Sequence, residues 1–235
     1  MPLRKQKKSV LVQKRFRCGM KFERQAWSDG YRLIAGVDEV GVGALFGPVV
    51  AAAVILDPAK PIRGLKDSKV LEPEEREKLA QKIRHSALAW ALGSVDAHEI
   101  DRINIYQASR VAMRQAVMEL VLTPDLLLVD ARRLDVSIAQ IPIIHGDAIS
   151  VSIAAASILA KVERDALMQE WDRVFPQYGL ADHKGYSTPS HKKVLKELGP
   201  SPLHRRSYAP VRNSIPEDEP LPGRSLFLPF QPAEA

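Results

Sequence analysis

The hydrophobic positions of the chain fall into short apolar runs that are bounded by Gly, Pro or charged residues. Apolar runs of this length predict buried strands. The five predicted strands cover residues 33–37, 48–56, 88–95, 126–129 and 141–144. The glycine-rich stretch between the first two is short enough for an antiparallel connection. The sheet is therefore expected to begin with a hairpin.

Three longer segments carry apolar residues at helical spacing and predict helices. They cover residues 73–84, 97–122 and 153–174, and the last begins with small residues that allow close packing. Helices thus alternate with strands in the second half of the chain, whereas the first half begins with the hairpin. This order predicts an α/β fold in which a mixed sheet is covered by helices, and we find no internal repeat.

Length and composition favour one large domain with an appendage at each end. A chain of 235 residues with 46% hydrophobic content can bury a sizeable core. We expect residues 27–212 to form the domain. Residues 1–26 are predicted to be a basic extension, disordered without a partner, and residues 213–235, rich in Pro and acidic residues, to be a loose tail.

Positive charge is concentrated near the two ends of the chain, within a total of +6. Residues 1–24 hold nine Lys or Arg against one Glu, a net of +8, and residues 184–212 hold seven against one, a net of +6. Residues 25–183 hold 17 basic and 22 acidic residues, a net of −5. This layout suits a cation site with a polyanion bound around it. A solvated basic tail explains the first 24 residues equally well.

The sequence favours a cytoplasmic protein. The longest apolar run, near residues 49–56, is far too short to cross a bilayer, and no apolar signal-peptide core follows the basic N-terminus. The single cysteine, Cys18, excludes an intramolecular disulfide and a multi-cysteine zinc site. A reducing compartment is therefore compatible with the chain, and no membrane contact is expected.

Four acidic residues follow or end predicted strands, namely Asp38, Glu39, Asp130 and Asp147. Ligands of open α/β sheets collect beyond the strand ends, and carboxylates there are costly unless a cation meets them. Clustered carboxylates favour Mg²⁺ or Mn²⁺, which prefer oxygen ligands. Taken alone, each acid is more readily explained by a structural role, for example Asp130 as a helix cap and Asp147 as a turn residue.

Asp38 and Glu39 raise a geometric difficulty, because neighbouring side chains on a regular strand point to opposite faces. If both bind one metal centre, the strand must bend or end at these residues. Gly41 and Gly43 make such a bend plausible, because glycine permits bulges and sharp turns.

These acids belong to a series of motifs that resembles the ribonuclease HII family over residues 27–211, in the family's order. The motifs are Gly36-Val37-Asp38-Glu39-Val40-Gly41-Val42-Gly43, Leu65-Lys66-Asp67-Ser68-Lys69, Leu127-Leu128-Val129-Asp130, Ser152-Ile153-Ala154-Ala155-Ala156-Ser157, His183-Lys184-Gly185-Tyr186 and Gly199-Pro200-Ser201-Pro202-Leu203-His204-Arg205-Arg206-Ser207. The resemblance implies a ribonuclease H-like, mixed five-stranded sheet flanked by helices, with a small helical C-terminal part. It also implies that the chain is a monomer.

The resemblance further implies an endonuclease that hydrolyses the RNA strand of RNA/DNA hybrids and nicks 5′ to ribonucleotides embedded in duplex DNA. Two Mn²⁺ or Mg²⁺ ions would take part, and the products would carry a 3′-hydroxyl and a 5′-phosphate. Asp38, Glu39, Asp130 and Asp147 match the family's metal-binding acids.

The family also implies residues that contact nucleic acid. Tyr186 matches the tyrosine that recognises the ribose 2′-hydroxyl, and Gly41-Val42-Gly43 stands where the family has Gly-Arg-Gly. Losing that arginine would remove a charge-assisted contact of about 1.5–3 kcal/mol if it binds a phosphate. A residue other than Arg here also resembles ribonuclease HIII, which prefers longer RNA tracts. The phosphate contacts that the family favours are Lys69, Lys184, Arg205 and Arg206.

Each of these assignments has a plainer alternative. The lysines are equally typical of a solvated surface, and a tyrosine is often a core residue. We interpret Asp165 as a partner in a surface ion pair on its helix. The histidines His145, His183, His191 and His204 are too widely spaced for a helical zinc motif, and His183 is expected to shape the loop that presents Tyr186.

Two other functions remain open at this point. A hybrid-binding protein without turnover would keep the fold, and Val42 is the motif-level reason to consider it. A junction resolvase or an integrase would share the acidic cluster but not the later motifs. The apolar residues 226–230 would suit a docking peptide for a sliding clamp, but a segment packed on the domain, or a loose one, explains them better.

Overall fold

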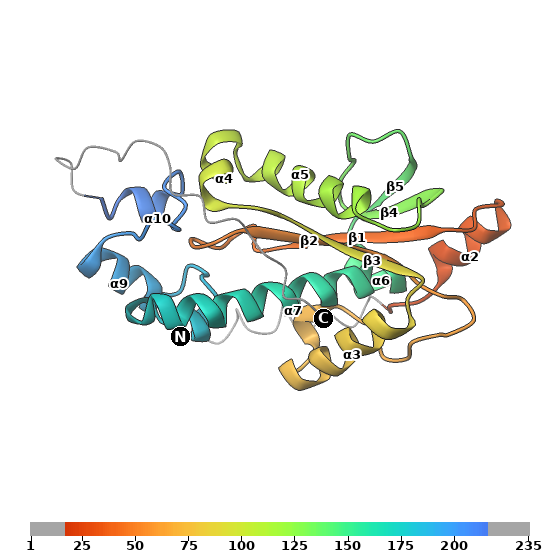
Figure 1. The fold of residues 1–235 in the computed structure, drawn as a ribbon, viewed down its shortest axis with the longest axis horizontal. Helices are drawn as coiled ribbons and strands as arrows, with labels where there is room; N and C mark the ends of the chain where they lie inside the picture. Colours follow the sequence, from red (N-terminus) through yellow and green to blue (C-terminus); the bar gives the residue numbers. More distant parts are fainter. Residues whose placement is uncertain (1–16, 216–235) are drawn as a thin grey trace, which may run out of the picture.

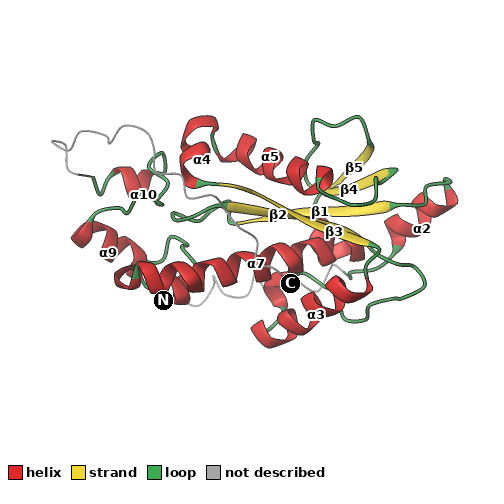
Figure 2. Cartoon of the chain, viewed as in Figure 1, coloured by secondary structure: helices red, strands yellow, loops and turns green. Residues whose placement is uncertain are grey.

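A five-stranded mixed sheet forms the centre of the protein, seen in a computed structural model that describes residues 17–215. The strand order is β3-β2-β1-β4-β5 (Figures 1 and 2). The strands are β1 (Ile34–Val40), β2 (Val49–Ile55), β3 (Ala89–Val95), β4 (Leu126–Asp130) and β5 (Ala139–Ile143). β1–β2 and β2–β3 pair antiparallel, whereas β1–β4 and β4–β5 pair parallel. The predicted mixed sheet and its opening hairpin are confirmed.

Helices cover both faces of this sheet (Figure 1). α4 (Ala97–Ile103) and α5 (Ile105–Met118) lie on one face, and α3 (Pro73–Ser86) and α7 (Val151–Val174) lie on the other. The other helices are α2 (Lys21–Ser28), α6 (Gly146–Ile149), α8 (Leu180–His183), α9 (Pro189–Leu198) and α10 (Ala209–Arg212), with 3-10 turns η1 (Ser68–Val70) and η2 (Pro176–Tyr178). Helices α8, α9 and α10, which follow α7 in the chain, form the predicted helical C-terminal part. No helix within residues 17–215 is long and apolar enough to cross a membrane.

The first turn of α7 lies directly against β1 at Gly36. A Cβ atom added at Gly36 would stand 2.1 Å from the carbonyl carbon and oxygen of Ser152. Alanines 154, 155 and 156 continue the close contact and are fully buried. Small residues on both elements therefore allow the backbone of α7 to approach the sheet and fix the position of the segment that precedes it.

The single helix predicted over residues 97–122 is wrong at Asn104, where α4 ends and α5 begins. Asn104 has φ 67°, a left-handed conformation that Asn tolerates better than most residues. Its side-chain oxygen accepts a hydrogen bond from the backbone N–H of Gln107 at 3.1 Å. Asn104 thus caps α5, which redirects the chain without a Gly or Pro.

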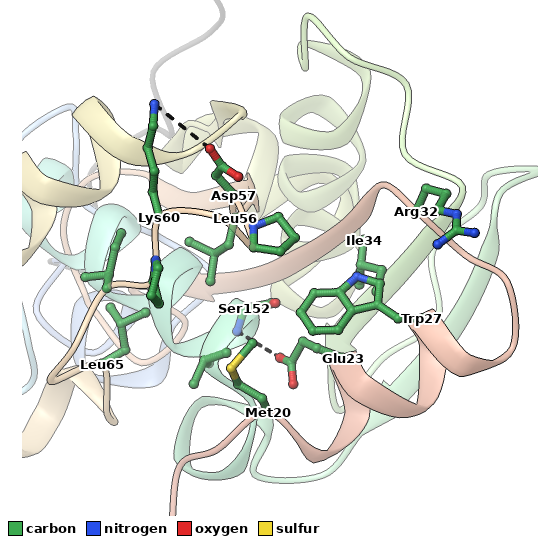
Figure 3. Close-up of a pocket in the computed structure, with 14 residues that line it drawn as sticks. Met20, Glu23, Trp27, Arg32, Ile34, Leu56, Asp57, Lys60, Leu65 and Ser152 are labelled. Atoms are coloured by element: carbon green, nitrogen blue, oxygen red, sulfur yellow. Dashed lines mark hydrogen bonds and ion pairs between the residues drawn. The ribbon is translucent and has the colours of Figure 1, made fainter.

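The prediction that residues 1–26 form a disordered extension is wrong for the part that includes α2. Ala26 is buried, and Phe22 and Trp27 pack against the same apolar cluster. Glu23 is only 2% exposed and accepts hydrogen bonds from the Ser150 hydroxyl at 2.6 Å and the Ser152 N–H at 3.0 Å. Figure 3 shows this helix beside a pocket that Met20, Glu23 and Trp27 line together with residues of β1 and α7.

Residues 226–230, considered for a clamp contact, lie outside the described residues.

Candidate active site

Asp38 and Glu39 lie within a regular part of β1, so the expected bend at these residues is wrong. The pairing with β2 continues in register through Asp38–Ala52, Glu39–Ala51 and Val40–Val50. The two carboxylates therefore point to opposite faces of the sheet. Asp38 points toward α7, and Glu39 points toward the side that α5 covers.

Asp38 is buried at 4% exposure and hydrogen-bonds with the Ser157 hydroxyl of α7. Ser157 is itself 2.9 Å from the Ser68 hydroxyl of η1. Burial raises the pKa of Asp38 well above its usual range, and the neighbouring charges of Glu39, Asp130 and Asp147 raise it further. A carboxylate in this position needs either a proton or a cation beside it.

Asp130 and Asp147 come together beyond the end of β4. Asp130 is the last residue of that strand, and its Oδ1 accepts a hydrogen bond from the Gly146 N–H at 2.7 Å. Asp147 follows on α6, is 6% exposed, and accepts a hydrogen bond from Lys69 Nζ at 2.6 Å. Burial, and then the charge of Asp147, raise the pKa of Asp130. These two acids and Asp38 are therefore close enough to influence one another.

Glu39 is held by a different cation. Its Oε1 lies 3.2 Å from Nη2 of Arg132, while Glu39 Oε2 is buried without a hydrogen-bond partner. The Arg132 guanidinium lies over the ring of Tyr106 on α5, 5.1 Å from the ring centroid. Burial raises the pKa of Glu39, and the Arg132 charge opposes this rise. Among the described residues 17–215, Glu39 is thus the one acid of the four that forms an ion pair with an arginine.

The donor chemistry of the four acids fits a divalent cation. All the donors are carboxylates, and three of them have raised pKa values because they are buried near one another. As the side chains stand, no three His, Cys, Asp or Glu residues within residues 17–215 are arranged to hold a metal ion. Lys69 and Arg132 each bind one of the acids. These two ion pairs occupy carboxylate oxygens that a bound cation would also use.

The glycine stretch after β1 is shaped by a buried arginine. Gly41 has φ 93°, and a Cβ atom there would stand 2.3 Å from Nε of Arg164. Arg164 donates hydrogen bonds to the carbonyls of Pro48 and Phe46, both at 3.1 Å, and to the carbonyl of Lys184 at 2.9 Å. Arg164 therefore joins this loop to the segment that carries Tyr186, and Gly41 provides the space for it.

Arg205 is not available for the predicted phosphate contact, because it is completely buried. Its Nη1 donates to the carbonyls of Gly41 at 2.7 Å and Val42 at 3.1 Å, and its Nε donates to the carbonyl of Gly47 at 2.9 Å. Burial lowers the pKa of Arg205 to about 10. Its place is to hold the glycine loop from the C-terminal side. Arg206, the next residue, is half-buried, and its backbone N–H donates a hydrogen bond to the Asp101 carboxylate.

Tyr186 lies beside the glycine loop, as the two motifs require if they act together. Ala44 and Tyr186 form an antiparallel bridge, and the Leu45 N–H donates to the Gly185 carbonyl at 2.8 Å. The Tyr186 ring is half-buried, with the Arg164 guanidinium carbon 5.2 Å and the Lys161 Nζ 5.7 Å from its centroid. It is therefore not a simple core tyrosine, and it stands in a positively charged environment.

The two lysines expected to contact phosphates, Lys69 and Lys184, each have a hydrogen-bond partner within the protein. The ammonium of Lys69 is bound to Asp147, and that of Lys184 donates to the carbonyl of Ala181.

Gly43, in the glycine stretch after β1, is exposed, and a Cβ atom added there would meet nothing within 4 Å. The predicted ion pair of Asp165 is confirmed, with Lys161 Nζ 2.7 Å from its Oδ1.

The histidines form a network behind the Tyr186 loop. His183 accepts the Gly185 N–H on Nδ1 at 3.2 Å and stacks on His191, with ring centroids 4.3 Å apart. The Nε2 atoms of His191 and His204 are 3.0 Å apart, and Nδ1 of His191 lies 3.0 Å from the Tyr186 carbonyl oxygen. The expected role of His183 in shaping this loop is confirmed.

The buried imidazoles of this network are expected to stay neutral in mildly acidic solution. Burial lowers the pKa of His191 to about 4 and that of His204 to about 3. An unfolded histidine takes up a proton near pH 6.5, so their contribution to stability is complete above that pH and decreases as the pH falls toward 4. The measurement is an NMR titration that follows the imidazole resonances of His191 and His204, which should not shift between pH 8 and pH 5. A titration of either ring near pH 6.5 would contradict this prediction.

Sequence reasoning missed three side chains of this site. Arg132 comes two residues after Asp130, Ser157 lies in the α7 motif, and Arg164 precedes the residue already assigned to an ion pair. Their residue types carry no signal for these roles, since Arg and Ser are common on helices and loops. Only the register of β1 and the packing of α7 indicate their positions.

Comparisons with known proteins agree with this fold. The family model described as Ribonuclease HII matches residues 35–211. Ribonuclease HII of Koribacter versatilis is 60% identical over 198 residues, which cover 84% of this chain and 78% of the relative. Among solved structures, the ribonuclease H2 of Pyrococcus horikoshii has a TM-score of 0.69 at 28% identity and covers 78% of this chain and 97% of its own. In a PCNA complex from Archaeoglobus fulgidus, ribonuclease HII has a TM-score of 0.63 at 28% identity, covering 74% and 93%.

Proposed function

Because the chain belongs to the ribonuclease HII family, a class of ribonuclease H that acts on RNA/DNA hybrids, we propose that it is a metal-dependent endonuclease that cuts on the 5′ side of a ribonucleotide. The substrates would be the RNA strand of hybrids and ribonucleotides embedded in duplex DNA. The observation that carries the proposal is the mutual approach of Asp38, Asp130 and Asp147, with Glu39 on the adjacent strand position.

The four acids would hold Mn²⁺ or Mg²⁺ through carboxylate oxygens. Such ions supply the positive charge that activates a water nucleophile and stabilises the leaving 3′ oxygen. The surrounding residues keep the carboxylates in place, since Ser157 bonds Asp38 and the Gly146 N–H bonds Asp130. Attack by water leaves a 5′-phosphate on the ribonucleotide and a 3′-hydroxyl on the upstream strand.

Recognition of the ribose would fall to the glycine loop and Tyr186. Arg164 and Arg205 hold the loop carbonyls, so the backbone of Gly41 to Gly43 is ordered before a substrate arrives. A preorganised backbone loses little entropy when it binds the 2′-hydroxyl. In this proposal Val42 replaces a cationic side chain but leaves the backbone contacts, so selectivity for a single ribonucleotide is retained.

The experiment that tests this function is the cleavage of three labelled duplexes, each with Mn²⁺, Mg²⁺ or chelator. One contains a single ribonucleotide in DNA, one a four-ribonucleotide tract, and one only DNA. Metal-dependent cutting 5′ to the single ribonucleotide would support the proposal. Cutting of the tract alone would indicate a selectivity like that of ribonuclease HIII, and binding without cutting would favour a non-catalytic protein.

A contact with a sliding clamp remains part of the proposal. The structure from Archaeoglobus fulgidus is a complex of its ribonuclease HII with PCNA, and residues 226–230 of this chain are apolar. A peptide that covers these residues should bind the clamp of the source organism. Equal binding of a peptide with the two phenylalanines replaced by alanine would contradict this contact.

A further inference from the structure

Arg132 pairs with one of the four acids, a contact that the reaction chemistry alone does not explain. Its guanidinium Nη2 is 3.2 Å from Glu39 Oε1, and the guanidinium carbon is 5.1 Å from the ring centroid of Tyr106. The side chain of Arg132 is 20% exposed, and that of Glu39 is 8% exposed. The pair is therefore largely shielded from water, and a charge in such a pair is screened less than one on the open surface.

The backbone directs Arg132 toward this position. Ala131, between Asp130 and Arg132, has φ 49°, which is uncommon for a residue other than glycine. The Ala131 N–H donates to the Ile143 carbonyl at 3.0 Å, so the sharp turn is held by a hydrogen bond. One turn thus delivers an acid, Asp130, to one side of the site and a cation, Arg132, to the other.

Glu39 differs from the other three acids in the face of the sheet that it occupies. The unbroken register of β1 places Asp38 toward α7, and Glu39 on the side of α5, where Arg132 and Tyr106 meet it. Glu39 Oε2 remains buried without a hydrogen-bond partner. The arginine therefore satisfies one carboxylate oxygen and leaves the second without a hydrogen-bond donor.

We propose that Arg132 is a positioning residue that fixes the Glu39 carboxylate on its side of the sheet and competes with a divalent cation for it. The inference rests on the proposed function, because it takes the four acids to be a cation site. A cation bound by Glu39 must displace the guanidinium or share the carboxylate with it, and two positive groups on one carboxylate repel each other. Removing the charge of Arg132 should therefore tighten cation binding.

The test is a titration of the full chain with Mn²⁺ as the probe, in which free Mn²⁺ is measured by electron paramagnetic resonance. Arg132→Gln should lower the dissociation constant about three- to tenfold, an effect on the scale of one partly screened ion pair. Arg132→Lys keeps the charge and should stay close to wild type. Arg133→Gln removes the neighbouring exposed arginine, whose backbone carbonyl accepts a hydrogen bond from Arg110 Nε, and should also stay close to wild type.

A double-mutant cycle shows whether the effect acts through Glu39. In a Glu39→Gln background, Arg132→Gln should no longer change Mn²⁺ affinity. An unchanged or weaker affinity of Arg132→Gln alone, or an equal gain in Arg133→Gln, would overturn the inference while leaving the proposed function intact. If wild type binds no Mn²⁺, or if Asp38→Asn does not weaken its binding, the proposed function itself fails.

Discussion

Asp130→Asn is expected to abolish cleavage, with a loss of about 10³-fold or more, while the protein still folds and binds duplex. The loss has this size because a preorganised charged group at a reacting centre acts on that scale. Asparagine retains the side-chain oxygen that accepts the Gly146 N–H, so the turn after β4 should persist. The measurement compares cleavage of a duplex with one ribonucleotide and, in the presence of chelator, the affinity for the same duplex.

Asp165→Asn is the matched control for this substitution. Asp165 is also a partly buried aspartate, but it is paired with Lys161 on its own helix and lies outside the acidic cluster. The control should retain activity within about threefold, because the loss of one structural ion pair outside the acidic cluster has only a small energetic effect. Turnover of Asp130→Asn at the wild-type rate would remove Asp130 from the site.

Gly36→Ala is expected to destabilise the fold by about 3 kcal/mol, the upper part of the range for overpacked cores. The new methyl group would stand 2.1 Å from the backbone of Ser152 and 2.5 Å from the nitrogen of Ile153. Backbone atoms cannot turn away as a side chain can, so α7 would have to move off β1. The measurement is the free energy of unfolding in urea, in which this change is a large share of the total for a typical domain.

Gly43→Ala provides the comparison for this effect. Nothing lies within 4 Å of a Cβ atom at Gly43, and the residue is exposed. Its free energy of unfolding should change by no more than about 0.5 kcal/mol. If Gly36→Ala is as mild as Gly43→Ala, the close packing of α7 on β1 is not as described.

The pattern of apolar positions was sufficient to predict the layers of the fold. Each predicted strand has a counterpart in the sheet, and the long helix predicted over residues 153–174 matches α7 closely. The break at Asn104 escaped prediction because the apolar spacing continues across it and Asn is not a strong helix breaker. The helix α2 is short and follows a basic stretch without sustained periodicity, so a packed helix resembled part of a charged extension.

The sequence indicated the acids of the candidate site but not its cations. Carboxylates after apolar strands pointed to Asp38, Asp130 and Asp147, and the resemblance to the family assigned them as metal ligands, which stays a prediction. Arg205 was misassigned because an Arg-Arg pair gives no sign of which member is buried, and only the loop carbonyls around it decide this. Arg132 could not be found because its partner, Glu39, was expected on the same side of a bent strand as Asp38. Tertiary packing carries this information.

The measurement that tests the central claim most directly is the analysis of product ends after cleavage of a duplex with one embedded ribonucleotide. With Mn²⁺, the account predicts a single cut 5′ to the ribonucleotide, a 3′-hydroxyl on the upstream strand and a 5′-phosphate on the ribonucleotide, and no cut with chelator. A cut that persists in chelator and leaves a 2′,3′-cyclic phosphate would contradict it, because the ribose hydroxyl rather than water would then be the nucleophile.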